Sequence, residues 1–217
     1  MYKKKMKKGL FLFISLISMI SLFFLYYFNI IPHSYYFNSD FNILTYESLV
    51  DKDRDGVQDQ LDVLNSAKAY VETKPKYKSQ YYKNGYPDDQ YGVCTDVVAF
   101  ALKAAGYDLQ ELVYEDIKKE SQAYGIEKID KAIDFRRVVN LNVYFKRNHI
   151  TLTTDLKEID AWQGGDIVVF PSHIGIISDK RNKKGIPFLI HHSNPYQFRY
   201  EEDVLARYTI LGHYRIS

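Results

Sequence analysis

Residues 162–193 read "WQGGDIVVFPSHIGIISDKRNKKGIPFLIHHS", and this stretch decides the predicted fold. It contains three short runs rich in β-branched residues, at 166–171, 173–179 and 187–193. Such runs are typical of buried strands. The segment "KRNKKG" between the last two runs is polar and ends in glycine, as a hairpin loop does. We therefore expect consecutive antiparallel strands in this part of the chain.

The region before these strands has the residue spacing of helices. The run from Thr95 to Ala105 carries apolar residues at helical spacing, and Gly106 follows it as a stop signal. Further helices are expected at about 61–71, 108–120 and 137–147, and one more strand at 207–216. Helices first and strands last, without βαβ alternation, predict an α+β domain in which N-terminal helices pack on a C-terminal antiparallel sheet.

The N-terminus has the composition of a membrane segment. Residues 1–8 contain five lysines, and residues 9–32 contain no charged side chain. About 20 apolar residues span a bilayer, so we expect an uncleaved transmembrane helix with its basic tail in the cytoplasm. A cleaved signal peptide is the alternative. Both place the remainder outside the cytoplasm, with 33–50 as a juxtamembrane linker and 51–217 as the folded domain; the protein would be secreted if cleavage occurs.

The overall charge gives no indication of nucleic-acid binding. The chain has 29 Lys and Arg against 27 Asp and Glu, a net charge of +2, and the five lysines of the N-terminal tail exceed this whole excess. A nucleic-acid-binding domain normally carries a basic patch, so no such partner is expected. The oligomeric state is left open.

An acidic segment, "DKDRDGVQDQLD" at 51–62, resembles a calcium-binding loop. Oxygen ligands on alternate residues around a glycine are the pattern of an EF-hand loop. The sequence predicts a structural Ca²⁺ site, although the last position is Asp where Glu is usual. The alternative is a solvated acidic turn that caps the next helix. The expected ligands are Asp51, Asp53, Asp55, the Val57 carbonyl, Asp59 and Asp62.

Cys94, in "YGVCTDVVAF" at 91–100, is the only cysteine in the chain. It stands where a helix is expected to begin, and the helix dipole and unpaired amides lower the pKa of a thiol at that position. We therefore interpret Cys94 as a candidate nucleophile. Gly92 would leave room for a close approach of substrate or backbone. Asp96 either satisfies first-turn amides or orients a partner.

A thiol nucleophile needs a base, and His173 and His191 are the best placed of six histidines. They lie on neighbouring predicted strands, where facing side chains are about 5 Å apart. One histidine can then hold the other in the required tautomer. His192 should point to the opposite face of its strand. We expect a Cys94–His173–His191 arrangement of nucleophile, general base and orienting residue, rather than a zinc site.

Several segments resemble, in order, the bacterial domain-of-unknown-function 1287 family. They are "GVCTDVV", "DFRRVVNL", "WQGGDIVVF", "HIGIISDKRN", "LIHH" and "ILGHYR", and the similarity covers about residues 50–217. That family looks like a branch of the NlpC-type, papain-like cysteine peptidases and amidases, which act on amide bonds of cell-wall peptides. The resemblance implies a papain-like fold, Cys94 as nucleophile, His173 as base and His191 as the third polar residue.

The chain departs from the family pattern at two places. Val139 stands where proline is usual, and His191–His192 stand where "HN" is usual, which leaves open which histidine faces the site. The segment "IDFRR" offers Arg136 and Arg137 either as ligands for a substrate carboxylate or as members of an Asp–Arg network.

The sequence therefore predicts a membrane-anchored, extracytoplasmic thiol hydrolase, and the resemblance and the expected location imply peptidoglycan stem peptides as its substrate class. Two alternatives are a calcium-stabilised cell-surface binding module without turnover and a thiol acyltransferase on the same scaffold.

Overall fold

The computed structural model describes the backbone of residues 2–217 and the side chains from residue 8 onward. The chain divides into two compact units, one ending at Ser34 and one comprising Tyr35–Ser217. The first contains helix α1, Tyr2–Tyr27, whose segment Lys8–Tyr27 is long and apolar enough to cross a membrane or to act as a signal sequence. This helix ends before the last apolar residues of the sequence segment, because the chain turns at Asn29, which has a φ of 54°.

The second unit is built on a six-stranded antiparallel sheet with the strand order β3-β8-β4-β5-β6-β7. The three runs that decided the predicted fold form its centre, as consecutive antiparallel strands. The short edge strands β3 and β7 were not predicted. The strands are β3 Ile150–Thr151, β4 Ile167–Val169, β5 Ile174–Arg181, β6 Pro187–Ile190, β7 Glu201–Glu202 and β8 Gly212–Arg215.

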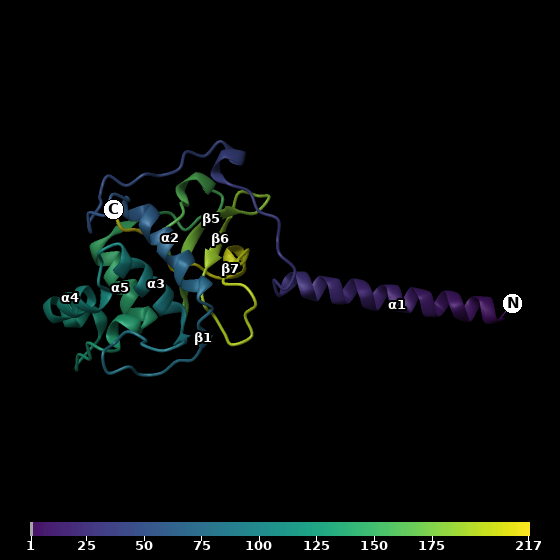
Figure 1. Cartoon of the computed structure of the whole chain (residues 1–217), viewed down its shortest axis with the longest axis horizontal. Coiled ribbons are helices and arrows are strands. Elements are labelled where there is room, and N and C mark those ends of the chain that lie inside the picture. Colours follow the sequence, from purple (N-terminus) through teal and green to yellow (C-terminus); the bar gives the residue numbers. More distant parts are fainter. Residues whose placement is uncertain (1) are drawn as a thin grey trace. The chain divides into compact units, whose positions relative to one another are not determined.

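The helices of this unit lie where the sequence predicts them, with boundaries that differ by a few residues. Helix α3 ends just before Gly106, whose φ of 80° suits a glycine after a helix C-terminus. Figure 1 shows α2 beside α3, and α2 also contacts strand β5. The helices are α2 Asp59–Glu72, α3 Cys94–Ala104, α4 Leu109–Tyr124 and α5 Val138–Asn148, with 3-10 turns η1 Asn38–Phe41, η2 Asp134–Arg136, η3 Ile159–Ala161 and η4 Leu205–Arg207.

Apolar side chains cover both faces of the sheet. In β4, Ile167 and Val169 belong to the cluster that includes the helices, whereas Val168 belongs to a second cluster around Trp162 and Leu205. This division follows from the alternation of side chains along a strand. In β5, Ile174 and Ile176 pack in the cluster with α3, and Ile177 packs in the cluster with Leu205 on the other face. Packing on both faces holds this strand in place.

Residues 35–50 belong to the folded unit and not to a free linker. The backbone N–H of Tyr36 donates to the Arg181 carbonyl at 2.8 Å, and Asn38 bonds Gln163 at 2.9 Å and Arg181 at 2.6 Å. Arg181 is buried, and Asn38 Oδ1 accepts from its Nε, while its Nη1 donates to the carbonyls of Ile159 and Gly185. Of the segment 33–50, expected to be a linker, the residues from Tyr35 onward thus belong to the compact unit Tyr35–Ser217.

Two further strands precede α3. Strands β1, Lys76–Tyr77, and β2, Tyr91–Gly92, pair in parallel and form a separate two-stranded sheet. Strand β2 leads directly into α3, so its hydrogen bonds help to fix where that helix begins.

Candidate active site

Cys94 is the first residue of helix α3, as the sequence predicts. Val93 is the N-cap residue, and its backbone N–H donates to Asp96 Oδ2 at 2.9 Å. The carboxylate at the third helical position thus reaches back to the residue before the helix, which is half of a capping box. This contact holds the chain in the conformation that presents the Cys94 thiol at the helix start.

The thiol of Cys94 is partly buried against the first residue of β5. A backbone hydrogen bond from Ile174 and the amides of Thr95 and Cys94 itself lower its pKa, but burial has the larger effect and raises the pKa to about 11. The expectation of a lowered thiol pKa is therefore corrected for the free protein, because desolvation outweighs the helix start. The residue immediately before Ile174 is His173, so the thiol lies next to that segment of the sheet.

His173 and His191 are in contact, as expected for neighbouring strands. The distance between His173 Nε2 and His191 Nδ1 is 2.8 Å, and the two rings meet edge to face with centroids 5.0 Å apart. His191 Nε2 lies 3.0 Å from Glu202 Oε2, on β7. We refer to His173, His191 and Glu202 as the relay. Burial, followed by the nearby His191 and His192, lowers the pKa of His173 to about 3.

No hydrogen bond joins Cys94 to His173 in the part of the chain that the structure describes. Within the same residues, His173 Nδ1 has no hydrogen-bond partner, because the contact with His191 uses Nε2. His173 is partly exposed, so this nitrogen is the end of the relay that another group can reach. Cys94 and His173 are thus placed in adjoining segments, with the thiol against Ile174.

His192 points away from the relay, as the alternation of side chains predicts. Its ring meets Tyr77 and Tyr200 edge to face, with centroids 5.3 and 4.9 Å apart. Its Nδ1 is buried and has no partner within the described residues, and burial lowers its pKa to about 4. Of the two adjacent histidines, His191 is therefore the one that contacts His173.

Asp96 and Arg136 form a buried ion pair. Asp96 Oδ1 accepts from Arg136 Nε at 2.7 Å and Oδ2 accepts from Nη2 at 2.9 Å, while Nη1 donates to the Gln80 carbonyl at 2.8 Å. All three guanidinium nitrogens of Arg136 thus donate to acceptors within the protein. Arg137 is exposed and lies 3.9 Å from Asp134. The geometry favours the Asp–Arg network over a site for a substrate carboxylate.

Gly92 does not leave open space beside the thiol. A Cβ at this position would lie 2.3 Å from the Tyr70 hydroxyl and 3.7 Å from Asp96 Oδ2. The glycine is therefore required because Tyr70 packs against the backbone there, and not because a substrate approaches. The Tyr70 hydroxyl is buried and has no hydrogen-bond partner among the described residues.

Three residues of the acidic loop form a compact group. One carboxylate oxygen from each of Asp51, Asp53 and Asp55 lies within 4.8 Å of the others, and the group is largely exposed. Burial, followed by Asp55 and the other loop acids, raises the pKa of Asp62 to about 6. Asp59 accepts hydrogen bonds from the Tyr107 hydroxyl and from the Lys52 backbone at 2.8 Å. Of the six expected ligands, Asp51, Asp53 and Asp55 are the ones that lie together as a group that could hold a metal ion.

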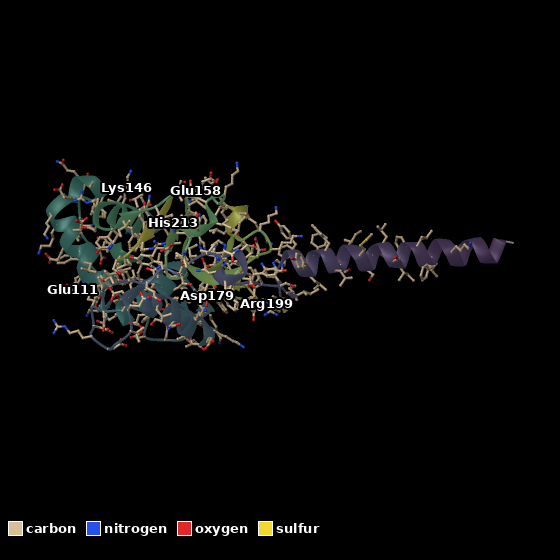
Figure 2. The ribbon with its side chains drawn as sticks, turned by 90° about the horizontal axis from the view of Figure 1, so that it is seen from above. Glu111, Lys146, Glu158, Asp179, Arg199 and His213 are labelled. Atoms are coloured by element: carbon tan, nitrogen blue, oxygen red, sulfur yellow. The ribbon has the colours of Figure 1, made fainter. Side chains whose placement is uncertain are left out.

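The remaining histidines have other contacts. His213 is fully buried, with Nδ1 2.7 Å from the Thr153 carbonyl and Nε2 2.9 Å from Asp166 Oδ2, and Figure 2 shows it within the folded unit. His149 Nδ1 lies 3.3 Å from the Ile216 carbonyl, and His33 Nε2 lies 2.9 Å from the Tyr26 carbonyl in the N-terminal unit. None of these three contacts the relay.

Sequence reasoning missed Glu202 and Gln197. Glu202 is buried at the edge strand β7, and Gln197 Nε2 donates to Glu202 Oε2 at 3.1 Å. The only sequence signal was the pair Glu201–Glu202 after a polar and aromatic segment, which by itself indicates a solvated turn. The relay as a whole offers a neutral imidazole whose Nδ1 has no hydrogen-bond partner among the described residues, and the next residue in the chain, Ile174, bonds the neutral Cys94 thiol. An imidazole and a thiol can exchange one proton once they are within hydrogen-bond distance of each other.

The chain is similar to one curated protein and to one family model. It is 39% identical over 150 residues to the uncharacterized protein YijF of Escherichia coli strain K12. The matched segment covers 65% of this chain and 72% of YijF. No solved structure matches the chain. Residues 64–216 match the family model described as Domain of unknown function (DUF1287), and this segment contains Cys94 and the whole relay. Since that match spans more than half of the sequence, the chain belongs to the DUF1287 family.

Proposed function

We propose that the protein is an extracytoplasmic cysteine hydrolase that cleaves amide bonds, with cell-wall peptides as its substrate class. One observation carries the proposal. His173 forms a hydrogen bond of 2.8 Å with His191. It directly precedes strand β5, whose first residue, Ile174, contacts the Cys94 thiol. A thiol at a helix start and an imidazole oriented by a second polar group are the parts that a thiol hydrolase requires.

We also propose that the fold is of the NlpC-type, papain-like kind. The support is the placement of three elements. Helix α3 begins with Cys94 and packs on β5, and His173 directly precedes β5. His191 directly follows β6, the next strand of the sheet. A helix with the thiol at its first residue, packed on an antiparallel sheet that carries the base, is the arrangement expected from the resemblance.

The proposed reaction uses groups of this chain alone. The S–H bond of Cys94 breaks, its proton passes to His173 Nδ1, and sulfur bonds to the carbonyl carbon of the substrate. The resulting oxyanion accepts hydrogen bonds from backbone N–H groups at the start of α3, which have no partner within the helix. The C–N bond then breaks while His173 returns the proton to the leaving amine. Water hydrolyses the thioester and regenerates the thiol.

The pKa values define the resting state of this pair. A thiol with its pKa near 11 and an imidazole with its pKa near 3 are both neutral at pH 7. His173 therefore acts as a general base toward a neutral thiol and is not half of a preformed ion pair. Binding of a substrate amide beside the thiol has to stabilise the charges that proton transfer creates.

The same pKa values favour a second candidate, a cell-surface binding module that does not turn over substrate. A thiol whose pKa is raised by burial is a weak nucleophile, as expected where the cleft only binds its ligand. The two functions differ in what Cys94→Ala does. It abolishes hydrolysis in the first case and leaves binding unchanged in the second.

The test is incubation of the full chain, in detergent, with purified peptidoglycan, followed by mass spectrometry of the released fragments. Cys94→Ala and His173→Gln should reduce release by about 100-fold or more, the usual contribution of a nucleophile or general base. His149→Gln is the matched control, because His149 is partly buried but bonds only the Ile216 carbonyl. Undiminished release by Cys94→Ala would refute Cys94 as the nucleophile. No release by the unmodified protein, with binding of peptidoglycan unchanged in Cys94→Ala, would refute the hydrolase and support the binding module.

We further propose that α1 is an uncleaved anchor. The support is the length of its apolar segment, Lys8–Tyr27. The intact mass of the protein recovered from the membrane fraction tests this directly. A mature N-terminus within or after this segment would show that it is a cleaved signal peptide.

A structural Ca²⁺ ion at residues 51–62 is also proposed. The support is the spacing of the Asp51, Asp53 and Asp55 carboxylates and the raised pKa of Asp62, which reflects burial and unbalanced negative charge. Ca²⁺ should raise the melting temperature of EDTA-treated protein. Asp51→Asn should remove this gain, whereas Asp88→Asn, an exposed acid outside the loop, should keep it. Equal melting temperatures in Ca²⁺ and EDTA would leave the loop as a solvated turn.

A further inference from the structure

We propose that Glu202 is a positioning residue that fixes the hydrogen atoms on both relay histidines, so that His173 presents Nδ1 as its proton-accepting nitrogen. This inference rests on the proposed function and adds a fourth group to it. Glu202 lies on β7, next to the strand that leads into His191. It is 7% exposed, so its carboxylate is held away from bulk water.

The argument begins at the carboxylate and proceeds outward. An ionised carboxylate only accepts hydrogen bonds, so His191 Nε2, which lies 3.0 Å from Glu202 Oε2, carries the hydrogen in that contact. A neutral His191 then has a bare Nδ1. That bare nitrogen accepts a hydrogen bond, so His173 Nε2, 2.8 Å away, carries the hydrogen there. His173 Nδ1 is consequently the bare nitrogen of the second ring.

Gln197 strengthens this assignment. Its Nε2 donates to Glu202 Oε2 at 3.1 Å and to the His191 carbonyl at 3.2 Å, which uses both of its hydrogens. The amide nitrogen also lies 3.2 Å from His191 Nε2, but it offers no lone pair to accept a hydrogen bond. His191 Nε2 therefore directs its hydrogen to Glu202. The Gln197 oxygen accepts from the Ser193 backbone at 2.7 Å, so the loop between β6 and β7 is fixed to the relay.

Glu202 also affects the proton transfer itself. When the Cys94 S–H bond breaks, the proton and its positive charge arrive on His173 Nδ1. The hydrogen bonds of the relay place the negative charge of Glu202 one ring away, where it stabilises the new imidazolium. Glu202 touches neither thiol nor substrate in this scheme and acts through His191.

The adjacent residue, Glu201, provides a matched control. Its carboxylate bonds the Ser178 hydroxyl and the Lys180 ammonium, the latter at 2.5 Å, and it does not contact the relay histidines. Glu201→Gln thus makes the same chemical change one residue away. An effect seen in Glu202→Gln but not in Glu201→Gln therefore arises from the hydrogen bond to His191 and not from the loss of one negative charge on β7.

The first test measures the tautomers directly. The full chain, labelled with ¹⁵N-histidine and held in detergent at pH 7, gives distinct nitrogen shifts for bare and hydrogen-bearing ring positions. We expect His173 and His191 both to carry hydrogen on Nε2, with signals assigned by single His→Gln variants. Hydrogen on Nδ1 of His191 in the unmodified protein would overturn the proposal. This spectrum needs no variant of Glu202, so it can overturn the proposed hydrogen positions even where Glu202→Gln does not fold.

The second test measures the alkylation rate of Cys94 by iodoacetamide at pH 7. Glu202→Gln should react about tenfold more slowly, which corresponds to one pKa unit, and Glu201→Gln should stay within about twofold of the unmodified rate. Equal rates for Glu202→Gln and the unmodified protein, or an equal loss in Glu201→Gln, would overturn the proposal. Neither test uses peptidoglycan, so failure of the hydrolase proposal, seen as cleavage by Cys94→Ala, is distinguishable from failure of this one.

Discussion

Two buried clusters of histidine and carboxylate lie on the same sheet and are built differently. In the closed cluster of Asp166, His213 and Arg215, both His213 nitrogens have oxygen partners, at 2.7 and 2.9 Å, and Arg215 bonds both Asp166 oxygens at 2.7 and 2.8 Å. In the relay, the chain of hydrogen bonds ends at His173, whose Nδ1 has no partner among the described residues. The difference is that both ring nitrogens of the first cluster are bonded within the fold, whereas the second ends in a ring nitrogen without a partner among the described residues.

The surroundings of the two clusters agree with this contrast. The Trp162 ring stacks on His213 with centroids 3.8 Å apart and an interplanar angle of 5°, and it closes one side of the cluster. The relay instead ends near the segment that contacts Cys94, and its last ring is partly exposed. We therefore expect changes in the closed cluster to reduce stability and changes in the relay to reduce reactivity.

Asp166→Asn should have the largest effect on stability. It removes the carboxylate from the buried His213 and from Arg215, whose side chain is 11% exposed, and loss of one partner of a buried ion pair costs about 3–5 kcal/mol. Urea unfolding of the full chain in detergent measures the change. Asp179→Asn is the matched control, since Asp179 pairs with Lys68 on the surface, at 2.6 Å, where such a pair contributes at most about 1 kcal/mol. A loss below about 1 kcal/mol for Asp166→Asn would show that the closed cluster is not structural.

His213→Gln should come next. Glutamine can replace one of the two hydrogen bonds of His213 but not the stacking on Trp162, so one buried acceptor is left unpaired at a cost of about 1–3 kcal/mol. The same urea experiment applies. The alkylation rate of Cys94 should be unchanged in this variant, because His213 does not contact the relay. A slower alkylation at unchanged stability would merge the two clusters into one functional network.

The sequence predicts most of the parts of the relay but not its last member. The hairpin between residues 173 and 191 is evident from two strand-like runs and a polar loop, so the contact of these histidines follows from strand geometry. Glu202 could not be predicted, because β7 has two residues and follows an irregular loop without periodicity.

The thiol pKa and the role of Arg136 depend on tertiary packing. Position in a helix argues for a lowered Cys94 pKa, but the burial that raises it arises from packing of the thiol against Ile174. The Asp96–Arg136 pair joins residues that are 40 positions apart. The sequence alone favours a structural network within "IDFRR" over a substrate-binding arginine, but it does not identify Asp96 as the partner of Arg136.

Gly92→Ala tests the helix start that carries the thiol. The added Cβ would meet the Tyr70 hydroxyl at 2.3 Å, so the ring or the backbone must shift, and overpacking of this kind costs about 1–3 kcal/mol. Tyr70→Phe in the same chain removes the clashing oxygen, which has no hydrogen-bond partner within the described residues, and should restore most of the stability. Failure of the double variant to recover would mean that position 92 requires glycine for its backbone and not for the contact with Tyr70.

His173→Gln should change stability least at pH 7, by less than about 1 kcal/mol, because glutamine can keep the hydrogen bond to His191 and no second bond is lost. The effect should depend on pH. Burial lowers the pKa of His173 to about 3, below its ordinary value of 6.5, so at pH values between these the unfolded chain binds a proton at this residue that the folded chain excludes. Stability contributed by the neutral histidine is therefore lost as the pH falls from 6.5 toward 3.

The variant lacks this proton, so it should become more stable relative to the unmodified protein as the pH falls from 7 to 4. His192 has its pKa lowered to about 4 by burial and loses stability in the same direction, but it is present in both proteins and cancels in the comparison. Urea unfolding at pH 7, 5.5 and 4 measures the difference. A difference independent of pH would mean that His173 has the same pKa in the folded and the unfolded chain, and burial would then not exclude the proton from the relay.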